Sequence, residues 1–84
     1  MKEVIKIKFG NYSIIFDRIG GDLYRPSVNG DGQKVILPFI LEDWHIERVA
    51  KHINCLPTTD LPFDLFRMVV SGACRYATSW SMAE

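Results

Sequence analysis

The stretch IKIKFGNYSIIF, residues 5–16, has two apolar-rich runs on either side of Gly10-Asn11. A two-residue hairpin turn requires positive φ, which glycine and asparagine tolerate better than other residues. The turn sets the register of both strands. On one face the predicted cross-strand pairs are all apolar or aromatic: Phe9 with Tyr12, Ile7 with Ile14, and Ile5 with Phe16. The stretch therefore predicts a β-hairpin with one buried face.

The opposite face of the predicted hairpin has a mixed character. Its residues are Val4, Lys6, Lys8, Ser13, Ile15 and Asp17. Lysines are rarely buried, whereas exposed aliphatic side chains close to one another are typical of interaction surfaces. We interpret this face as a contact surface of mixed character.

Two further strands are predicted after the hairpin. Turn sequences at residues 20–22 and 29–32 flank LYRPSV, residues 23–28, and QKVIL, residues 33–37, precedes Pro38. Together with the hairpin they predict a four-stranded antiparallel meander. Because Pro26 has no backbone N–H, we expect its strand to lie at an edge of the sheet.

The hydrophobic period becomes helical in the second half of the chain. A helix is predicted over Asp43–Asn54, with an apolar stripe formed by Ile46, Val49, Ala50, Ile53 and Leu56. A second helix is predicted to begin near Asp60-Leu61-Pro62, with Asp60 as its cap. Its expected buried stripe is Leu61, Leu65, Val69, Ala73, Tyr76 and Trp80, with Phe66 and Ala77 alongside. Gly72 lies on the same side, which predicts a close backbone approach or a kink.

These elements predict one small α+β domain over residues 1–84, in which a four-stranded antiparallel meander is followed by two helices packed on one face of the sheet. Ten basic and ten acidic residues cancel, and an apolar content of 48% is ordinary for a globular chain. The run VILPFIL, residues 35–41, is shorter than the roughly 20 residues that span a bilayer. The N-terminal residues MKEVIKIK alternate in polarity and do not resemble a secretory signal, so we expect a cytoplasmic protein.

Two histidines and two cysteines in the helical half form the only candidate zinc set in the sequence. They are His45, His52, Cys55 and Cys74, and their spacing matches no common zinc motif. Cys74 is expected on the polar side of the second helix. Exposed histidines and two ordinary thiols are the favoured interpretation, with no metal and no cofactor.

Catalytic chemistry has equally little support in the sequence. Cys74 lies in the middle of a predicted helix, and Cys55 lies at a helix C-terminus, where the dipole disfavours a thiolate. The acidic pairs occur at helix starts, where they are favourable for structural reasons. We therefore expect a protein that is not an enzyme.

Nucleic-acid binding is the alternative function. Residues 1–34 contain six basic and four acidic side chains, and Lys6 and Lys8 project from the same sheet face. Further contributors to this face would be Arg18, Arg25, Lys34 and Tyr24. Nucleic-acid-binding domains usually have a larger basic excess, which makes this the second choice.

Trp44 lies away from the apolar stripe of the first predicted helix, on the side that it shares with Lys51. Trp44 is expected either to pack over the sheet from the entry turn of the helix or to remain exposed, and an exposed aromatic side chain of this kind would indicate an interface. The residues predicted to bind a partner are Trp44, Lys51, Val4, Ile15, Lys6 and Lys8. We expect a small non-catalytic protein-binding module acting as a regulator, inhibitor or adaptor, a class that includes phage and mobile-element proteins. Its partner would be another protein or a second copy in a homodimer, with no role for a membrane.

Overall fold

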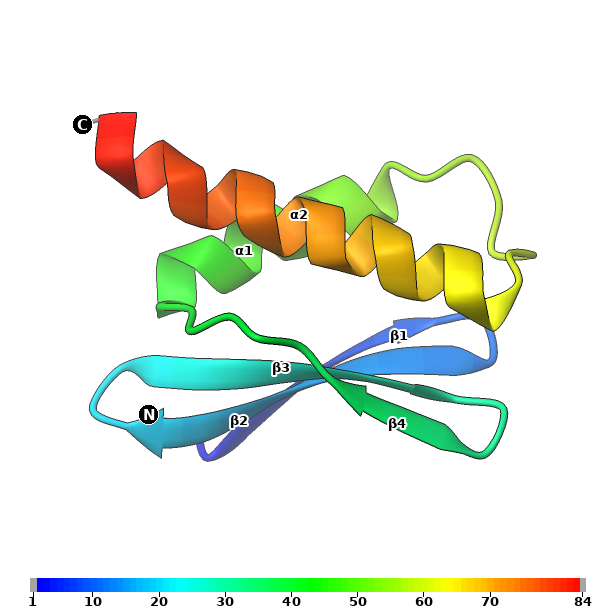
Figure 1. Cartoon of the computed structure of the whole chain (residues 1–84), viewed down its shortest axis with the longest axis horizontal. Coiled ribbons are helices and arrows are strands. Elements are labelled where there is room, and N and C mark those ends of the chain that lie inside the picture. The colour runs from blue at the N-terminus through cyan, green and yellow to red at the C-terminus, as the bar shows by residue number, and fades with distance from the viewer. Residues whose placement is uncertain (1, 84) are drawn as a thin grey trace.

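The computed structural model describes residues 2–83, with the side chains of residues 2–79. Four strands are followed by two helices: β1 (Val4–Phe9), β2 (Tyr12–Gly20), β3 (Leu23–Gly30), β4 (Gln33–Ile36), α1 (Asp43–Asn54) and α2 (Phe63–Ala83). The sheet is antiparallel with strand order β1-β2-β3-β4, and both helices lie on one face of it (Figure 1). The predicted α+β fold is confirmed. Within residues 2–83, no helix is both long and apolar enough to cross a membrane.

The hairpin has the predicted register. Phe9 pairs with Tyr12, Ile7 with Ile14, and Ile5 with Phe16. Gly10 supplies the positive φ of the turn, at 58°. A Cβ at this position would also lie 3.0 Å from the Thr59 carbonyl oxygen, so the turn needs glycine for conformation and for space.

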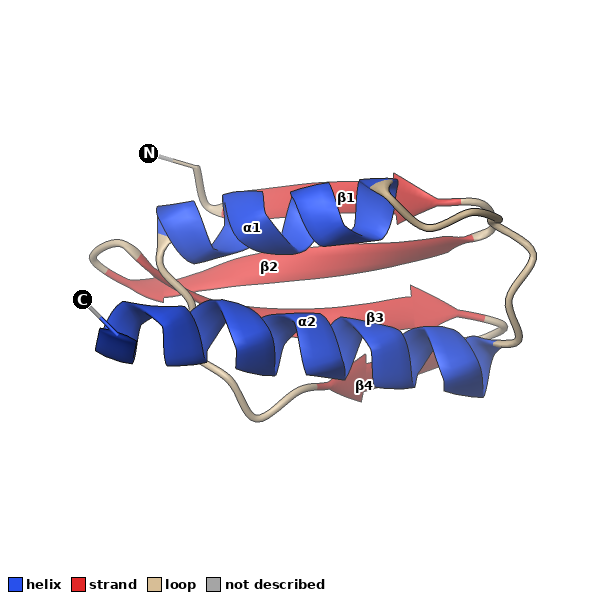
Figure 2. Cartoon of the chain, turned by 90° about the horizontal axis from the view of Figure 1, so that it is seen from above, coloured by secondary structure: helices blue, strands red, loops and turns tan. Residues whose placement is uncertain are grey.

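The helices cover the sheet in two halves. Seen from above, α1 lies over β1 and β2, and α2 lies over β3 and β4 (Figure 2). The core fills the layer between sheet and helices. Its fully buried residues include Ile14, Phe16 and Val28 from the sheet, Val49 from α1, and Phe66, Val70 and Ala77 from α2.

Aromatic side chains join the turn end of the sheet to the start of α2. The Phe9 and Phe66 rings stack with centroids 4.7 Å apart, and the Tyr12 ring lies 5.3 Å from that of Phe66. The Tyr12 hydroxyl donates to the Leu61 carbonyl oxygen at 2.7 Å. Gly30 lies beneath the Tyr12 ring, where any Cβ would overlap it. Tyr12 therefore holds β3, β2 and α2 together at this end.

The prediction that the strand containing Pro26 is an edge was wrong, because β3 is a central strand between β2 and β4. Pro26 is opposite Phe16 in β2 and accepts a hydrogen bond from the Leu37 N–H at 2.9 Å. Its ring nitrogen therefore points toward Leu37 rather than toward β2. The Leu37 carbonyl oxygen instead accepts from the Phe39 N–H at 2.9 Å. A central proline thus costs the β2–β3 ladder no hydrogen bond.

The strand β4 is short and ends before Pro38. After an irregular segment, Leu41 returns to β3 and exchanges two backbone hydrogen bonds with Tyr24, at 2.8 and 2.9 Å. This isolated bridge leads the chain directly into α1, whose bounds agree with the prediction.

The predicted cap of the second helix and part of its predicted buried stripe were wrong, although Ala73, Phe66 and Ala77 are buried as expected. Helix α2 begins at Phe63, so Asp60 lies in the preceding loop, where its N–H donates to Thr58 Oγ1 at 3.0 Å. The buried face consists of Phe63, Phe66, Val70, Ala73, Cys74 and Ala77. Leu65 and Tyr76 are exposed instead.

Two other expectations for α2 fail because the helix is rotated relative to the predicted stripe. Cys74 is fully buried and does not lie on the polar side. Gly72 is exposed, with no atom outside its own helical neighbourhood within 4 Å of an added Cβ, so it marks no close approach. The Trp80 side chain, assigned to the same stripe, lies outside the described residues.

Neighbouring residues of α2 provide a test of this rotation. Phe66→Ala should lower the free energy of unfolding by about 3 to 5 kcal/mol, because it removes a fully buried ring that stacks on Phe9. Leu65→Ala should lower it by less than about 1 kcal/mol, because Leu65 is 45% exposed. Urea denaturation of both variants measures the difference. Equal losses would show that the core face of α2 is assigned wrongly.

Candidate functional site

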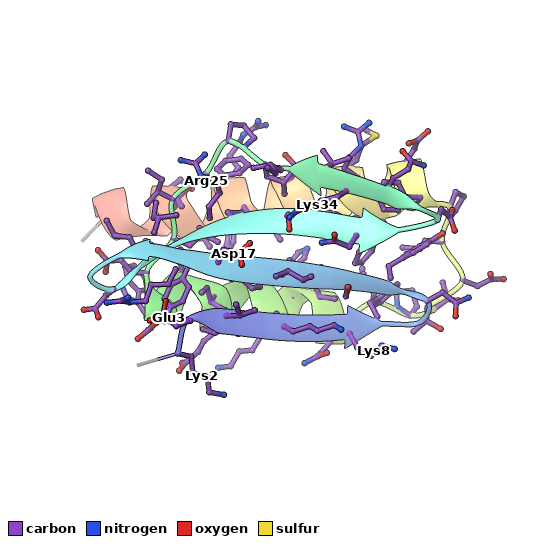
Figure 3. The ribbon with its side chains drawn as sticks, turned by 90° about the horizontal axis from the view of Figure 1, so that it is seen from below. Lys2, Glu3, Lys8, Asp17, Arg25 and Lys34 are labelled. Atoms are coloured by element: carbon purple, nitrogen blue, oxygen red, sulfur yellow. The ribbon has the colours of Figure 1, made fainter. Side chains whose placement is uncertain are left out.

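The face of the sheet opposite the helices is the main candidate binding surface, and we call it the outer face. Side chains alternate along each strand, so the register assigns its members. From β1 to β4 they include Val4, Lys6 and Lys8; Ser13, Ile15 and Asp17; Leu23, Arg25, Ser27 and Asn29; and Lys34 and Ile36. Figure 3 looks onto this face, with Lys8, Asp17, Arg25 and Lys34 labelled.

The outer face is strongly basic although the whole chain is neutral. Four of its side chains are basic, those of Lys6, Lys8, Arg25 and Lys34, and within residues 4–36 one is acidic, that of Asp17. Asp17 is directly opposite Arg25 in the β2–β3 register. The face therefore presents a positive potential to any partner.

The centre of the outer face has one short side chain with aliphatic side chains on both sides. Ser27 is only 2% exposed, although no helix covers it, because its short side chain lies between Ile15 and Ile36 in neighbouring strands. The Ser27 hydroxyl donates to the Ile15 carbonyl oxygen at 3.4 Å and accepts from Asn29 Nδ2 at 3.1 Å. Ile36 is 59% exposed. The outer face therefore has an aliphatic centre surrounded by basic side chains.

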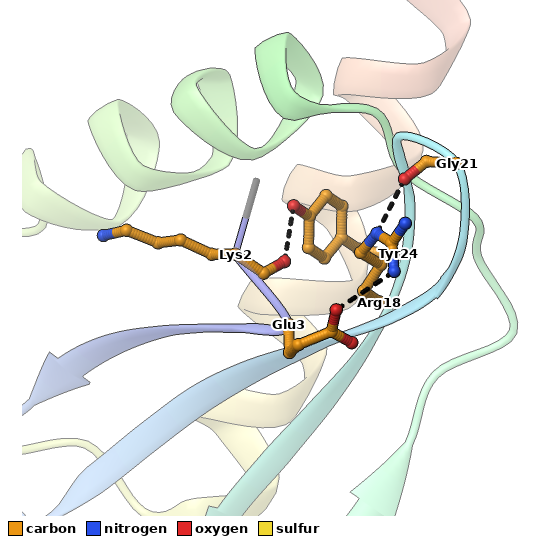
Figure 4. A network of polar contacts seen from close by, with 5 residues as sticks. All are labelled: Lys2, Glu3, Arg18, Gly21 and Tyr24. Carbon is orange, nitrogen blue, oxygen red and sulfur yellow. Dashed lines mark hydrogen bonds and ion pairs between the residues drawn. The ribbon is translucent and has the colours of Figure 1, made fainter.

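Four of the predicted partner-binding residues lie together on the outer face, namely Val4, Ile15, Lys6 and Lys8. Of the suggested contributors, Arg25 and Lys34 join them, but two were assigned wrongly. Arg18 pairs with Glu3 at 3.1 Å and donates to the Gly21 carbonyl oxygen at 2.8 Å (Figure 4). Tyr24 is buried on the helix side, where its hydroxyl donates to the Lys2 carbonyl oxygen at 3.0 Å.

The other two predicted residues, Trp44 and Lys51, lie on α1 in the helical layer. Trp44 is 37% exposed, and its indole N–H donates to Glu42 Oε1 at 2.7 Å. Its ring lies 4.1 Å from that of His45 and 5.6 Å from the Arg48 guanidinium carbon. Lys51 lines a shallow depression between α1 and α2. The six predicted residues therefore belong to two separate surfaces.

His45 belongs to the start of α1, not to an exposed surface as expected. Its Nδ1 accepts the Glu42 N–H at 2.9 Å, so the neutral ring carries its proton on Nε2. Nε2 is buried and has no hydrogen-bond partner among the described residues. Burial lowers the pKa of His45 below its usual value and outweighs the opposing effect of the Glu42 carboxylate, while Arg48 lowers the pKa further.

Acid should therefore weaken the fold through His45. Because its pKa is lower in the folded than in the unfolded chain, the unfolded state binds more protons as pH falls below about 6.5. The stabilising contribution is present above that pH and is lost as pH falls through the folded pKa. We expect His45→Gln, which keeps a side-chain acceptor but does not titrate, to depend less steeply on pH over this window. Urea denaturation across the window tests this, since parallel profiles would exclude His45 as the source.

The two thiols have opposite environments. Burial raises the pKa of Cys74 to about 12, so this thiol remains protonated in the core. Cys55 is exposed at the end of α1. In the described part of the chain, no three His, Cys, Asp or Glu side chains are grouped closely enough to hold a metal ion. The candidate zinc set is therefore dispersed.

Thiol titration should distinguish the two cysteines. In the native protein a colorimetric disulfide reagent should react rapidly with one thiol per chain, because only the exposed Cys55 is accessible to it. In denaturant both should react. Cys55→Ser is the matched control and should remove the rapid phase entirely. A rapid native reaction in that variant would contradict the burial of Cys74.

A second concave surface lies between β1 and α1, with a volume of about 440 Å³, and we call it the β1–α1 groove. Ile5 and Ile7 of β1 line one side, and Ile46 and Ala50 of α1 line the other. The remaining lining residues are Lys2, Tyr24, Asp43 and Glu47. Burial raises the pKa of Tyr24, as does the nearby Asp43, so its hydroxyl stays neutral.

Sequence reasoning missed Ile36 and the groove. Ile36 was detectable, because alternation from Gln33 places Lys34 and Ile36 on the same face as Ser27. The groove had no signal in the sequence, since it depends on how far α1 lies from the β1 edge.

No known protein family model, curated protein or solved structure matches this chain.

Proposed function

We propose that this protein is a small non-catalytic protein-binding module, acting as a regulator, inhibitor or adaptor, and that its outer face binds an acidic surface of another protein. The observation that carries the proposal is a sheet face that no element within residues 2–83 covers, in which aliphatic side chains lie among four basic ones. Exposed aliphatic residues surrounded by polar groups are typical of protein interfaces.

A protein partner fits the outer face better than nucleic acid. Sheets that bind single-stranded nucleic acid stack bases on aromatic side chains. Throughout strands β1 to β4 the outer face has no aromatic side chain, because Phe9, Tyr12, Phe16 and Tyr24 all face the helices. Ile36 and Val4 would gain nothing from phosphate groups but would bury apolar area against a protein.

Two of the reactive side chains support a non-catalytic role. His45 uses Nδ1 to hold the start of α1, and Cys74 is buried with a raised pKa. Both side chains therefore have structural roles. Trp44 and Lys51 lie on a separate surface of the helical layer, and Lys51 is changed in the control variant so that the test distinguishes the two surfaces.

Affinity capture from the native host with three forms of the chain tests the proposal. Lys6→Glu with Lys34→Glu should weaken partner binding by about tenfold or more, because attraction to acidic groups becomes repulsion. The matched control, Lys51→Glu with Arg75→Glu, makes the same charge change at exposed helical positions and should retain binding. All four side chains are exposed, so both variants should fold.

The outcomes separate the candidate surfaces and functions. Loss of capture only in the control variant would move the binding site to the helical layer, near Trp44 and Lys51. Tight, salt-dependent binding of the wild-type chain to labelled single- or double-stranded oligonucleotides, abolished by Lys6→Glu with Lys34→Glu, would establish nucleic-acid binding instead.

A further inference from the structure

The free edge of β1 presents unpaired backbone groups in a regular row. Arg18 donates its N–H to the Glu3 carbonyl oxygen at 2.9 Å, and the register then directs the backbone groups of Ile5, Ile7 and Phe9 toward β2. The N–H and C=O groups of the alternate residues, Val4, Lys6 and Lys8, therefore point away from the sheet. Because β1 is an edge strand, this row is a template for another strand.

The β1–α1 groove lies beside this edge, on the helix side of the sheet. Ile5 and Ile7 are only half-buried, whereas their hairpin partners Phe16 and Ile14 are fully buried. The difference arises because the space under α1 has no further strand to fill it. Lys2 and Tyr24 also line the groove, and the Tyr24 hydroxyl donates to the Lys2 carbonyl oxygen at 3.0 Å (Figure 4).

Charge specifies which side chains an added strand would carry. In an antiparallel strand, the residues directly opposite Lys6 and Lys8 point to the outer face, where acidic side chains are favoured. The intervening residues point into the groove, where Ile5, Ile7, Ile46 and Ala50 favour apolar side chains. Asp43 and Glu47 at the groove disfavour acidic groups there.

A second copy of this chain does not satisfy these requirements. Antiparallel pairing of β1 with β1 of another copy, centred on Lys6, places Lys6 opposite Lys6 and Val4 opposite Lys8. Like charges directly opposite each other are destabilising. Antiparallel pairing of two β1 edges in this register is therefore disfavoured.

We propose that the β1 edge binds an extended segment of a partner protein as an additional antiparallel strand, with apolar residues in the β1–α1 groove and acidic residues beside Lys6 and Lys8. The inference rests on the proposed function, since it names the segment through which a protein partner binds. The added strand would also widen the outer face, so both contacts are compatible with one partner.

Backbone methylation of a model peptide tests the added strand. The probe is a capped six-residue peptide, matched to the length of β1, in which valine alternates with glutamate. Titration into isotope-labelled protein should shift the amide signals of Val4, Lys6 and Lys8. N-methylation of the glutamates, whose N–H groups face β1, should weaken binding by about tenfold or more, because the donors are lost. N-methylation of the valines should leave the affinity within about threefold.

Two controls make the result specific. A peptide of the same composition with its valines and glutamates in separate blocks should bind at least about tenfold more weakly, because alternation is lost. Ala50→Trp should fill the groove and reduce affinity similarly, whereas Asn54→Trp at an exposed position of α1 should not. Equal binding of both peptides, equal effects of the two methylations, or normal binding by Ala50→Trp would each overturn the inference.

Failure of this inference is distinguishable from failure of the proposed function. If no peptide binds but partner capture still depends on Lys6 and Lys34, the proposal of an added strand is wrong. The proposal that the outer face binds the partner remains supported. If the alternating peptide binds as expected but Lys34→Glu alone, on β4 and away from the β1 edge, leaves capture unchanged, the edge site remains supported and the proposed use of the outer face is wrong.

Discussion

The register of the β1–β2 hairpin is the constraint on which the other features depend. Gly10 provides the positive φ of the turn, and the pairing of Phe9 with Tyr12 follows from it. A slip of one residue would exchange the two faces of a strand, so that lysines would face the helices and isoleucines would face water. The same turn contacts Thr59, which couples the register to the loop that leads into α2. Sheet faces, helix placement and edge chemistry are therefore consequences of one local geometry.

The parts of the fold that could be predicted are those in which local and tertiary preferences agree. The hairpin and α1 each have a single apolar face, and the structure buries that face. In α2 apolar side chains occur on opposite sides of the helix, so the period does not identify the buried side. Leu65 and Phe66 are equally apolar, and contact with Phe9 decides between them. The edge prediction for the strand that contains Pro26 failed for a different reason. Strand propensity does not reveal toward which neighbouring strand the proline nitrogen points.

The candidate surfaces also include parts that the sequence predicts and parts that it does not. Lys6 and Lys8 follow from alternation alone, and their neighbours Arg25 and Lys34 required the register of the later strands. Arg18 could not be assigned, because the Arg18–Glu3 ion pair depends on how the ends of β1 and β2 meet. The β1–α1 groove is a property of two elements distant in sequence, and neither element encodes it separately. The basic side chains of one strand could therefore be predicted from the sequence, whereas the groove could not.

The two edges of the sheet are unequal, and this limits how the protein can assemble. At the β4 edge, the strand has only four residues, Lys34 interrupts its apolar character, and Pro38 follows with no N–H to offer. At the β1 edge, six residues continue without a proline. The short β4 edge offers fewer backbone groups to a further strand than the β1 edge does. If a partner adds a strand at β1, this inequality would favour a complex of fixed size over a fibre.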